Sequence, residues 1–149
     1  MTATGIEGPM GRLGMQLAWH GKITDTRMRR ALSATGLTPR HAMTLMNLGG
    51  GPVSQQALIE QLGVDPSSVV SLLNDLENDD LVRRRRDPAD RRRHIVEITD
   101  EGAETLSRLE AALAKVEDEM FVGLSAEERT LLGSLLTKIS ASHSDYDCA

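Results

Sequence analysis

The feature of this sequence best suited to chemistry is a run of arginines. Residues 83–93 read RRRRDPADRRR, so seven arginines and two aspartates give eleven residues a net charge of +5. Guanidinium groups match phosphate oxygens in shape and charge. A thin arginine-rich loop can also enter the DNA minor groove, where negative potential is enhanced over A·T-rich sequence. The run therefore predicts contact with nucleic acid, with Asp87 and Asp90 placed to fix the direction of neighbouring arginines.

The charge of the whole chain leaves a second interpretation of this run open. The 149 residues carry 17 Lys+Arg and 22 Asp+Glu, a net charge of -5, and the chain outside residues 83–93 has a net charge of -10. No Lys or Arg occurs between Arg40 and Arg83. An acidic protein repels nucleic acid as a whole. The arginines could instead form a solvated surface strand that pairs with acidic helices of the same chain.

The segments around the run indicate what positions it. The turn-forming residues 87–90 lie between the arginines and the strand-like segment His94–Ile98, which predicts a hairpin. Upstream, Ser54 and Asp65 are good N-caps and Gly63 is a good helix stop, so residues 54–63 and 65–80 read as two short helices joined by a tight turn. This is a helix-turn-helix pattern.

Further helices flank this unit. Two helices are predicted before it, one over residues 13–32 and one that begins at Thr38-Pro39. Two more are predicted after it, capped by Thr99 and Ser125. Apolar residues from Leu106 to Gly123 repeat at heptad-like spacing, which suits either a dimer seam or packing within one chain. We expect a mainly α fold with a small β-hairpin wing, a winged helix-turn-helix flanked by dimerisation helices. The expected divisions are a flexible arm at 1–10, a dimerisation helix at 11–36, the DNA-binding domain at 37–99 with its wing at about 82–98, dimerisation helices at 100–141 and a tail at 142–149.

The second helix of the pair would read DNA without using charge. Its exposed polar candidates are Ser67, Ser68, Ser71 and Asn74. Serine can contact base edges or phosphates, and asparagine can bind adenine through two hydrogen bonds. Ser67 and Ser68 could equally be ordinary capping residues of the first turn. Most of the affinity would then come from the hairpin, with a further contribution from Arg40.

On these residues the chain resembles the MarR family of winged-helix transcriptional regulators. The resemblance covers roughly residues 13–139 and is most specific in LVRRRRDPADRRRHIVEITDEG at 81–102. There an Asp-x-Arg at 90–92 is followed by a hydrophobic-Thr pair at 98–99 and then by Gly102. The match implies that Arg92 enters the minor groove and that Asp90 orients it. The chain departs from the family at Ser71, where members often carry arginine, so the operator sequence does not carry over.

The resemblance also implies the mode of action. It points to an obligate homodimer built from the first and the last two helices, which binds double-stranded DNA at a pseudo-palindromic operator with one reading helix per half-site. It implies repression that is relieved by a small, often phenolic or anionic, ligand. The DNA-binding candidates are Arg84, Arg85, Arg86, Asp90, Arg91, Arg92, Ser67, Ser68, Ser71, Asn74 and Arg40.

A ligand pocket between the dimerisation helices and the helix-turn-helix would draw on a small set of residues. The candidates are Met15, Trp19, His20, Met43 and Met46. With only three aromatic residues in the chain, any stacking on an aromatic ligand depends on Trp19. The alternative is that these methionines and Trp19 fill an irregular core.

Other kinds of site find little support. The four histidines share no metal-ligand spacing with one another or with Cys148, no nucleophile–base arrangement stands out, and the GGGP at 49–52 suits a linker. We expect no enzyme, no metal and no cofactor. One cysteine excludes an internal disulfide, and Cys148 lies in a polar tail, whereas oxidant-sensing relatives place theirs near the first helix. No apolar run approaches the roughly 18 residues of a membrane span, and residues 1–11 lack signal-peptide character, so we expect a cytoplasmic protein.

The sequence thus predicts a dimeric, sequence-specific DNA-binding regulator, in the main a repressor with an effector. Two rivals share its architecture. One is a winged-helix interaction module whose arginine hairpin docks an acidic protein, favoured by the lack of basic residues in 65–80. The other is a constitutive DNA-binding protein without an effector.

Overall fold

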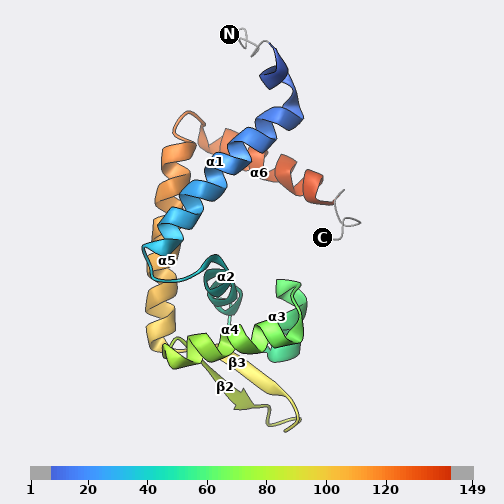
Figure 1. The fold of residues 1–149 in the computed structure, drawn as a ribbon, viewed down its shortest axis with the longest axis vertical. Coiled ribbons are helices and arrows are strands. Elements are labelled where there is room, and N and C mark those ends of the chain that lie inside the picture. Colours follow the sequence, from blue (N-terminus) through green and yellow to red (C-terminus); the bar gives the residue numbers. More distant parts are fainter. Residues whose placement is uncertain (1–7, 142–149) are drawn as a thin grey trace. The chain divides into compact units, whose positions relative to one another are not determined.

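The computed structural model describes residues 8–141 of the chain (Figure 1). They divide into two compact units, one ending at Ala114 and one beginning at Lys115. Cys148 and His143, considered above, lie outside the described residues. Within the described part, no helix is both long and apolar enough to cross a membrane.

The first unit contains the helix-turn-helix and the wing. Its elements are η1 (Pro9–Gly11), α1 (Leu13–Ser33), α2 (Pro39–Leu48), β1 (Val53–Ser54), α3 (Gln55–Leu62), α4 (Pro66–Asn78), β2 (Val82–Arg86) and β3 (His94–Ile98). Helix α5 (Asp100–Met120) begins in this unit, and the second unit contains its end and α6 (Ala126–Ala141). The start of the expected N-terminal arm falls outside the described residues, but Pro9–Gly11 forms a 3-10 turn rather than a loose segment.

The predicted helix starts are confirmed by their capping hydrogen bonds. Thr38 Oγ1 accepts from His41 N at 3.3 Å, and Ser54 Oγ accepts from Ala57 N at 3.1 Å. Each bond satisfies a backbone N–H that the first turn of a helix leaves without a partner. Gly63 ends α3 in the left-handed conformation, with φ of 61°, which costs glycine little because it has no Cβ.

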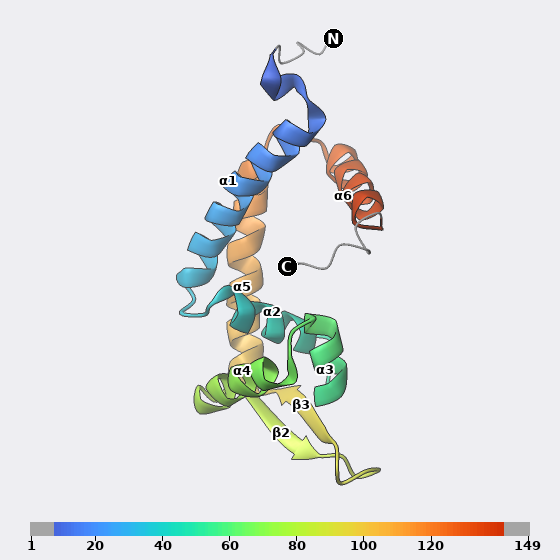
Figure 2. The same ribbon diagram turned by 45° about the vertical axis from the view of Figure 1, so that its right-hand side comes forward.

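The wing is part of a three-stranded antiparallel sheet in the order β1-β3-β2. β2 pairs with β3 from Val82↔Ile98 to Arg86↔His94, so the predicted hairpin is confirmed. The sequence-based prediction missed β1, in which Val53 pairs with Val96. Two residues are too few to show the alternation that reveals a strand. In both views the hairpin extends from the helices of this unit (Figures 1 and 2).

One hydrophobic core holds the helix-turn-helix to the sheet. Its fully buried side chains come from α2, α3, α4, β3 and α5: Leu45, Leu48, Leu58, Val69, Leu73, Leu76, Val96 and Leu109. Burial of apolar surface at about 25 cal/mol per Å² is the main force that fixes these elements to one another. α4 and the wing therefore hold a defined position within the first unit.

The heptad-like seam divides between two environments. Leu106 and Leu109 are buried in the core of the first unit, and Leu113 packs against it. This half of the seam packs within one chain, which was the alternative to a dimer seam. Helix α5 ends at Met120, so Gly123 lies outside the seam. In the second unit, four large apolar residues of α6 are exposed: Leu131, Leu135, Leu136 and Ile139.

Hydrogen bonds and close backbone packing join the end of α4 to the wing and to α5. Thr99 Oγ1 donates to the Asp80 carbonyl at 2.5 Å and accepts from Gly102 N at 3.0 Å, and Thr99 N donates to the Leu81 carbonyl at 3.0 Å. A Cβ at Gly102 would lie 2.0 Å from the Leu81 oxygen. The glycine is needed because α5 passes directly against this backbone.

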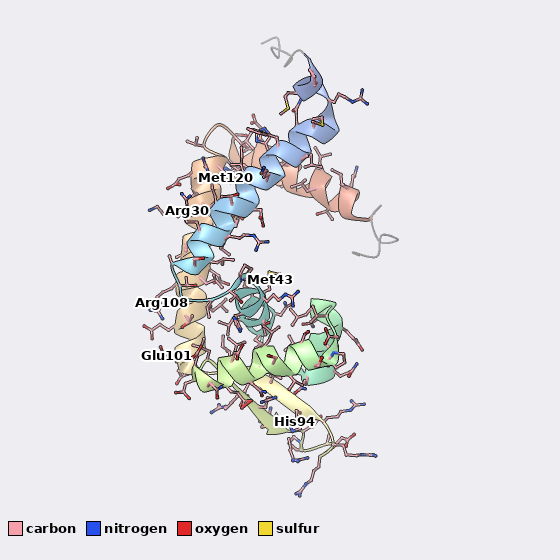
Figure 3. The ribbon with its side chains drawn as sticks, in the orientation of Figure 1. Arg30, Met43, His94, Glu101, Arg108 and Met120 are labelled. Carbon is pink, nitrogen blue, oxygen red and sulfur yellow. The ribbon has the colours of Figure 1, made fainter. Side chains whose placement is uncertain are left out.

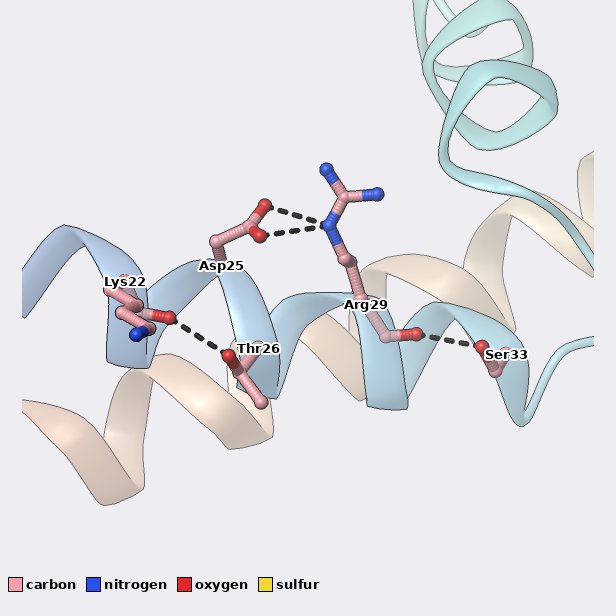
Figure 4. Close-up of polar contacts among 5 residues, drawn as sticks. All are labelled: Lys22, Asp25, Thr26, Arg29 and Ser33. Atoms are coloured by element: carbon pink, nitrogen blue, oxygen red, sulfur yellow. Dashed lines mark hydrogen bonds and ion pairs between the residues drawn. The ribbon is translucent and has the colours of Figure 1, made fainter.

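Helix α1 is polar along much of its length. Arg29 Nε donates to both carboxylate oxygens of Asp25, at 3.0 and 2.8 Å, one helical turn away (Figure 4). The pairing raises the pKa of the Arg29 guanidinium, first through the hydrogen bond and then through the charge of Asp25. Gly36, the predicted stop, follows the helix with φ of 80°.

Candidate nucleic-acid interface

Helix α4 has a buried face and an outer face on which most residues are uncharged. Val69, Leu73 and Leu76 are fully buried in the core. The other side carries exposed residues at helical spacing, namely Ser67, Val70, Ser71 and Asn74. Residues three and four apart share one face of a helix, so these four form a single surface, which we call the reading face. Val70 is 38% exposed and was not among the sequence-predicted site residues.

Asp65, which opens α4, is fully engaged as a cap. Its carboxylate accepts hydrogen bonds from the hydroxyl of Ser67, from the hydroxyl of Ser68 at 2.6 Å and from Ser68 N at 2.9 Å. The Ser67 hydroxyl, followed by the two donors of Ser68, holds the pKa of the Asp65 carboxyl far below its ordinary value. The capping alternative for Ser67 and Ser68 is thus what the structure shows, and neither hydroxyl proton is free for DNA in this arrangement.

A second acidic residue of α4 is paired with a histidine. His41 Nε2 lies 3.0 Å from Asp75 Oδ2, and His41 Nδ1 lies 2.6 Å from Thr38 Oγ1. The pair joins the first turn of α2 to the middle of α4. Asp65 and Asp75 are thus both held by hydrogen bonds, which fix their side chains but leave Asp65 ionised.

Two arginines of β2 pair with an acidic residue of the neighbouring strand. Arg83 Nε donates to Glu97 Oε1 at 2.7 Å, and Arg85 Nε lies 3.5 Å from Glu97 Oε2. The hydrogen bond from Arg83 is the main cause that lowers the pKa of Glu97. Arg86 donates instead to the Arg91 carbonyl at 2.7 Å and closes the wing loop.

Arg84 points the other way, toward α4. Its Nη2 donates to Asn74 Oδ1 at 2.6 Å, and its Nε donates to Glu77. The Arg84 side chain is 23% exposed. Arg84 was predicted to bind DNA, but its guanidinium joins the wing to the reading helix.

The tip of the wing carries an arginine that is almost fully exposed. The Arg92 side chain is 94% exposed, and its Nε lies 3.5 Å from Asp90 Oδ1. The same oxygen accepts from Arg92 N at 3.1 Å, and Arg93 Nε lies 3.7 Å from Asp90 Oδ2. Asp90 therefore contacts both the backbone and the side chain of Arg92, as the sequence predicted. Arg91 has no ion pair within residues 8–141.

A polar hollow of about 530 Å³ lies between the wing and the start of α3. It is lined by Ser54, Gln55, Gln56, Ala57, Ile59, Glu60, Arg92, Arg93 and His94. Figure 3 shows His94 at the wing. Backbone N–H groups at a helix start and two guanidinium groups suit a phosphate. Sequence reasoning missed Gln55, Gln56 and Arg93, although their place in the first turn of a helix-turn-helix and beside Arg92 could have indicated them.

The remaining candidates are not gathered into one pocket. Trp19 lines a hollow of about 320 Å³ on α1, whereas Arg40 and Met43 line another of about 270 Å³ with residues of α2, α3 and α4. Met15 and Met46 are exposed and line neither of these two hollows, nor does His20. Trp19 is 54% exposed, so it does not fill a core within the described residues.

Comparison of the sequence with known proteins finds similarity to transcriptional regulators. The MarR family model matches residues 35–93. A protein of Thauera aromatica, named as a transcriptional regulatory protein for the hcr operon, is 34% identical over 138 residues, which cover 90% of this chain and 82% of that protein.

Solved structures share the fold. The transcriptional repressor CouR, bound to a 23-mer DNA duplex, is 31% identical with a TM-score of 0.77, and the match covers 90% of this chain and 99% of that one. A MarR-family transcriptional regulator from Rhodococcus sp. RHA1 is 26% identical with a TM-score of 0.74, covering 89% of this chain and 95% of that one.

The Asp65 cap makes the stability of the chain depend on pH. The unfolded chain binds a proton at Asp65 near pH 4, and the folded chain binds it only at lower pH. The stabilisation is therefore complete above pH 4 and is lost as the pH falls toward the folded-state pKa. In Asp65→Asn, which retains a capping side chain, we expect urea unfolding to depend less steeply on pH between about pH 5 and 3. Ser67→Ala should be intermediate, and identical slopes in all three proteins would contradict this role.

Proposed function

The chain belongs to the MarR family of transcriptional regulators, and we propose that it acts as a homodimeric repressor that binds a pseudo-palindromic operator and releases it when a small aromatic anion binds. One observation carries the DNA-binding part of this proposal. The wing presents an arginine that is 94% exposed and held by Asp90, beside a reading face without charge. On this proposal Arg92 enters the minor groove and α4 lies in the major groove. The chain then works where the DNA is, in the cytoplasm.

The acidic groups of α4 do not favour an acidic protein partner over DNA. The interaction module was favoured by the absence of basic residues in α4. Within α4 and its cap, however, Asp65, Asp75 and Glu77 all have hydrogen-bond or ion-pair partners. These carboxylates would repel an acidic protein as well as DNA, so the absence of basic residues in α4 does not favour the interaction module. On our proposal, phosphate contacts from the wing supply the affinity.

Exposed apolar residues in each unit support a homodimer. On α1, Leu13 is 79% exposed and Leu17, one turn on, is also exposed. On α6, Leu131 and Leu135 are both exposed and lie four residues apart. Contiguous exposed apolar surface on a protein is usually covered by a partner. We propose that a second copy of the chain covers these faces, which would place two reading helices on two half-sites.

The hollow on α1 supports an anionic aromatic effector. It is lined by Trp19, Lys22, Ile23, Thr26, Arg27 and Arg30. No ion pair within the described residues engages Lys22, Arg27 or Arg30, because the acidic side chain of this region, Asp25, pairs with Arg29. An indole ring beside three cations suits a ligand that combines an aromatic ring with a carboxylate.

We expect Arg92→Ala to weaken binding to the chain's own upstream DNA about tenfold. Each phosphate contact releases counterions, so wild-type affinity should fall steeply as salt rises, and the loss of one cation should lower the salt slope by about one. Arg108→Ala removes the same charge from α5, away from the wing (Figure 3), and should leave affinity unchanged. Fluorescence anisotropy across a salt series checks this. A flat salt dependence, or equal affinity of Arg92→Ala and wild type, would refute the wing mechanism.

A charge on the apolar face of α6 should separate the dimer. We expect wild type to have the mass of two chains in light scattering at low micromolar concentration, and Leu135→Glu to have the mass of one, because a buried unpaired carboxylate is costly. Thr137→Glu, an exposed change on the same helix, should remain dimeric. The dimer proposal fails if wild type itself is a monomer.

Because the chain contains one tryptophan, its emission reports on the α1 hollow. We expect 4-hydroxybenzoate to change Trp19 fluorescence with saturation and to lower DNA affinity, whereas 4-hydroxybenzyl alcohol, which lacks the carboxylate, should do neither. Arg30→Ala should weaken the response several-fold, since it removes one cation from the hollow. If no member of a panel of phenolic acids changes either the emission or the affinity, the constitutive alternative is correct.

A further inference from the structure

The amide group of Asn74 has one possible orientation in this structure. Its side chain faces Arg84, whose Nη2 lies 2.6 Å away. A guanidinium has hydrogen-bond donors and no acceptor, so the amide atom facing it must be the oxygen. We infer that Asn74 presents its NH2 group, a pure donor, on the reading face of α4 and thereby selects guanine in the operator. This inference rests on the proposed function, because it specifies what the same interface reads.

The partner that orients Asn74 is itself held on two sides. Arg84 lies in the middle of β2, where it pairs with Val96 of β3. Its Nε donates to Glu77, which lies on α4 three residues after Asn74. Both side chains are less than one-third exposed. A charge-assisted pair with this little exposure loses less strength to solvent than a surface pair does. Arg84 therefore fixes the amide of Asn74 before DNA arrives.

The fixed oxygen changes which base asparagine can recognise. A free asparagine binds adenine by donating to N7 and accepting from the N6 amino group. One of the two lone pairs of Oδ1 is taken by Arg84, and the oxygen is held toward that side chain. The accepting half of that pattern is therefore weakened, and the NH2 group would face another NH2 group at adenine N6 or cytosine N4. Guanine presents N7 and O6 side by side, and both are acceptors. One donor nitrogen can reach both of these atoms.

The neighbours on the reading face leave this discrimination to Asn74. A serine hydroxyl rotates and can either donate or accept, so Ser71 discriminates weakly. Val70 offers apolar contact, which suits a thymine methyl group. Among the residues of this face, Asn74 alone combines a donor-only group with a partner from a different element.

The test is selection from a pool of randomised duplex DNA with the full-length protein. Comparing the sequences bound by wild type and by Asn74→Ala identifies the base pair that Asn74 reads, since only that preference should disappear. We expect this pair to be G·C, and its replacement by A·T to lower wild-type affinity about tenfold, within the usual cost of one mismatched pair. Asn47→Ala makes the same change on α2 and should select the wild-type sequence.

Two further variants test the orientation itself. Arg84→Met removes the donor and frees the amide oxygen, so the preference for guanine over adenine should fall several-fold. Asn74→Asp places a carboxylate opposite the acceptors N7 and O6, and should abolish the preference for guanine. Circular dichroism checks that both variants fold.

Three results would overturn the inference while leaving the proposed function intact: an A·T pair at the Asn74-dependent position, no effect of Asn74→Ala on any base preference, or an unchanged guanine preference in both Arg84→Met and Asn74→Asp. If wild type enriches no sequence at all, the proposed function itself fails and the inference fails with it.

Discussion

Seven guanidinium groups within eleven residues repel one another, and the interface depends on how this repulsion is relieved. Three acidic residues offset most of this repulsion by pairing with the arginines. Glu97 pairs with Arg83 and Arg85 across the hairpin, Glu77 holds Arg84 against α4, and Asp90 contacts Arg92 at the tip. Each pair also fixes a direction, because a guanidinium near a carboxylate gives up part of its rotamer freedom. The charge density that suits DNA is thus compatible with a folded, ordered wing.

The same ion pairs separate the arginines of β2, which hold the wing together, from those of the loop, which are exposed. Arg83 and Arg85 face Glu97 and Arg84 faces α4, as the two-residue period of a strand requires. They join strands and helix, whereas Arg91, Arg92 and Arg93 extend from the loop where solvent is accessible. Salt screens exposed charges more than partly buried ones. High salt should therefore weaken the contacts of the loop with DNA well before it loosens the attachment of the wing to the reading helix.

The order of elements could be read from the sequence because local rules decide it. Thr38, Ser54 and Asp65 cap the helices where a good N-cap residue stands, and the strands flank the predicted turn. What the sequence could not show depends on contacts between distant residues. Arg84 and Asn74 are ten residues apart and were both assigned to DNA, and only the packing of β2 on α4 reveals that they bind each other. The pairing of Val53 with Val96 and the burial of half of the α5 seam were hidden for the same reason.

The absence of positive charge from the reading helix now has a physical reason. A lysine or arginine at Ser71 would lie one turn from Asn74, whose amide binds Arg84, and would add a second positive charge to this part of the helix. An uncharged reading face avoids this and leaves attraction to the wing tip. The net charge of -10 outside residues 83–93 acts in the same direction, because the chain outside the wing repels a phosphate backbone as a whole. On the proposed function, the cationic loop is then the point of first contact between this acidic protein and DNA.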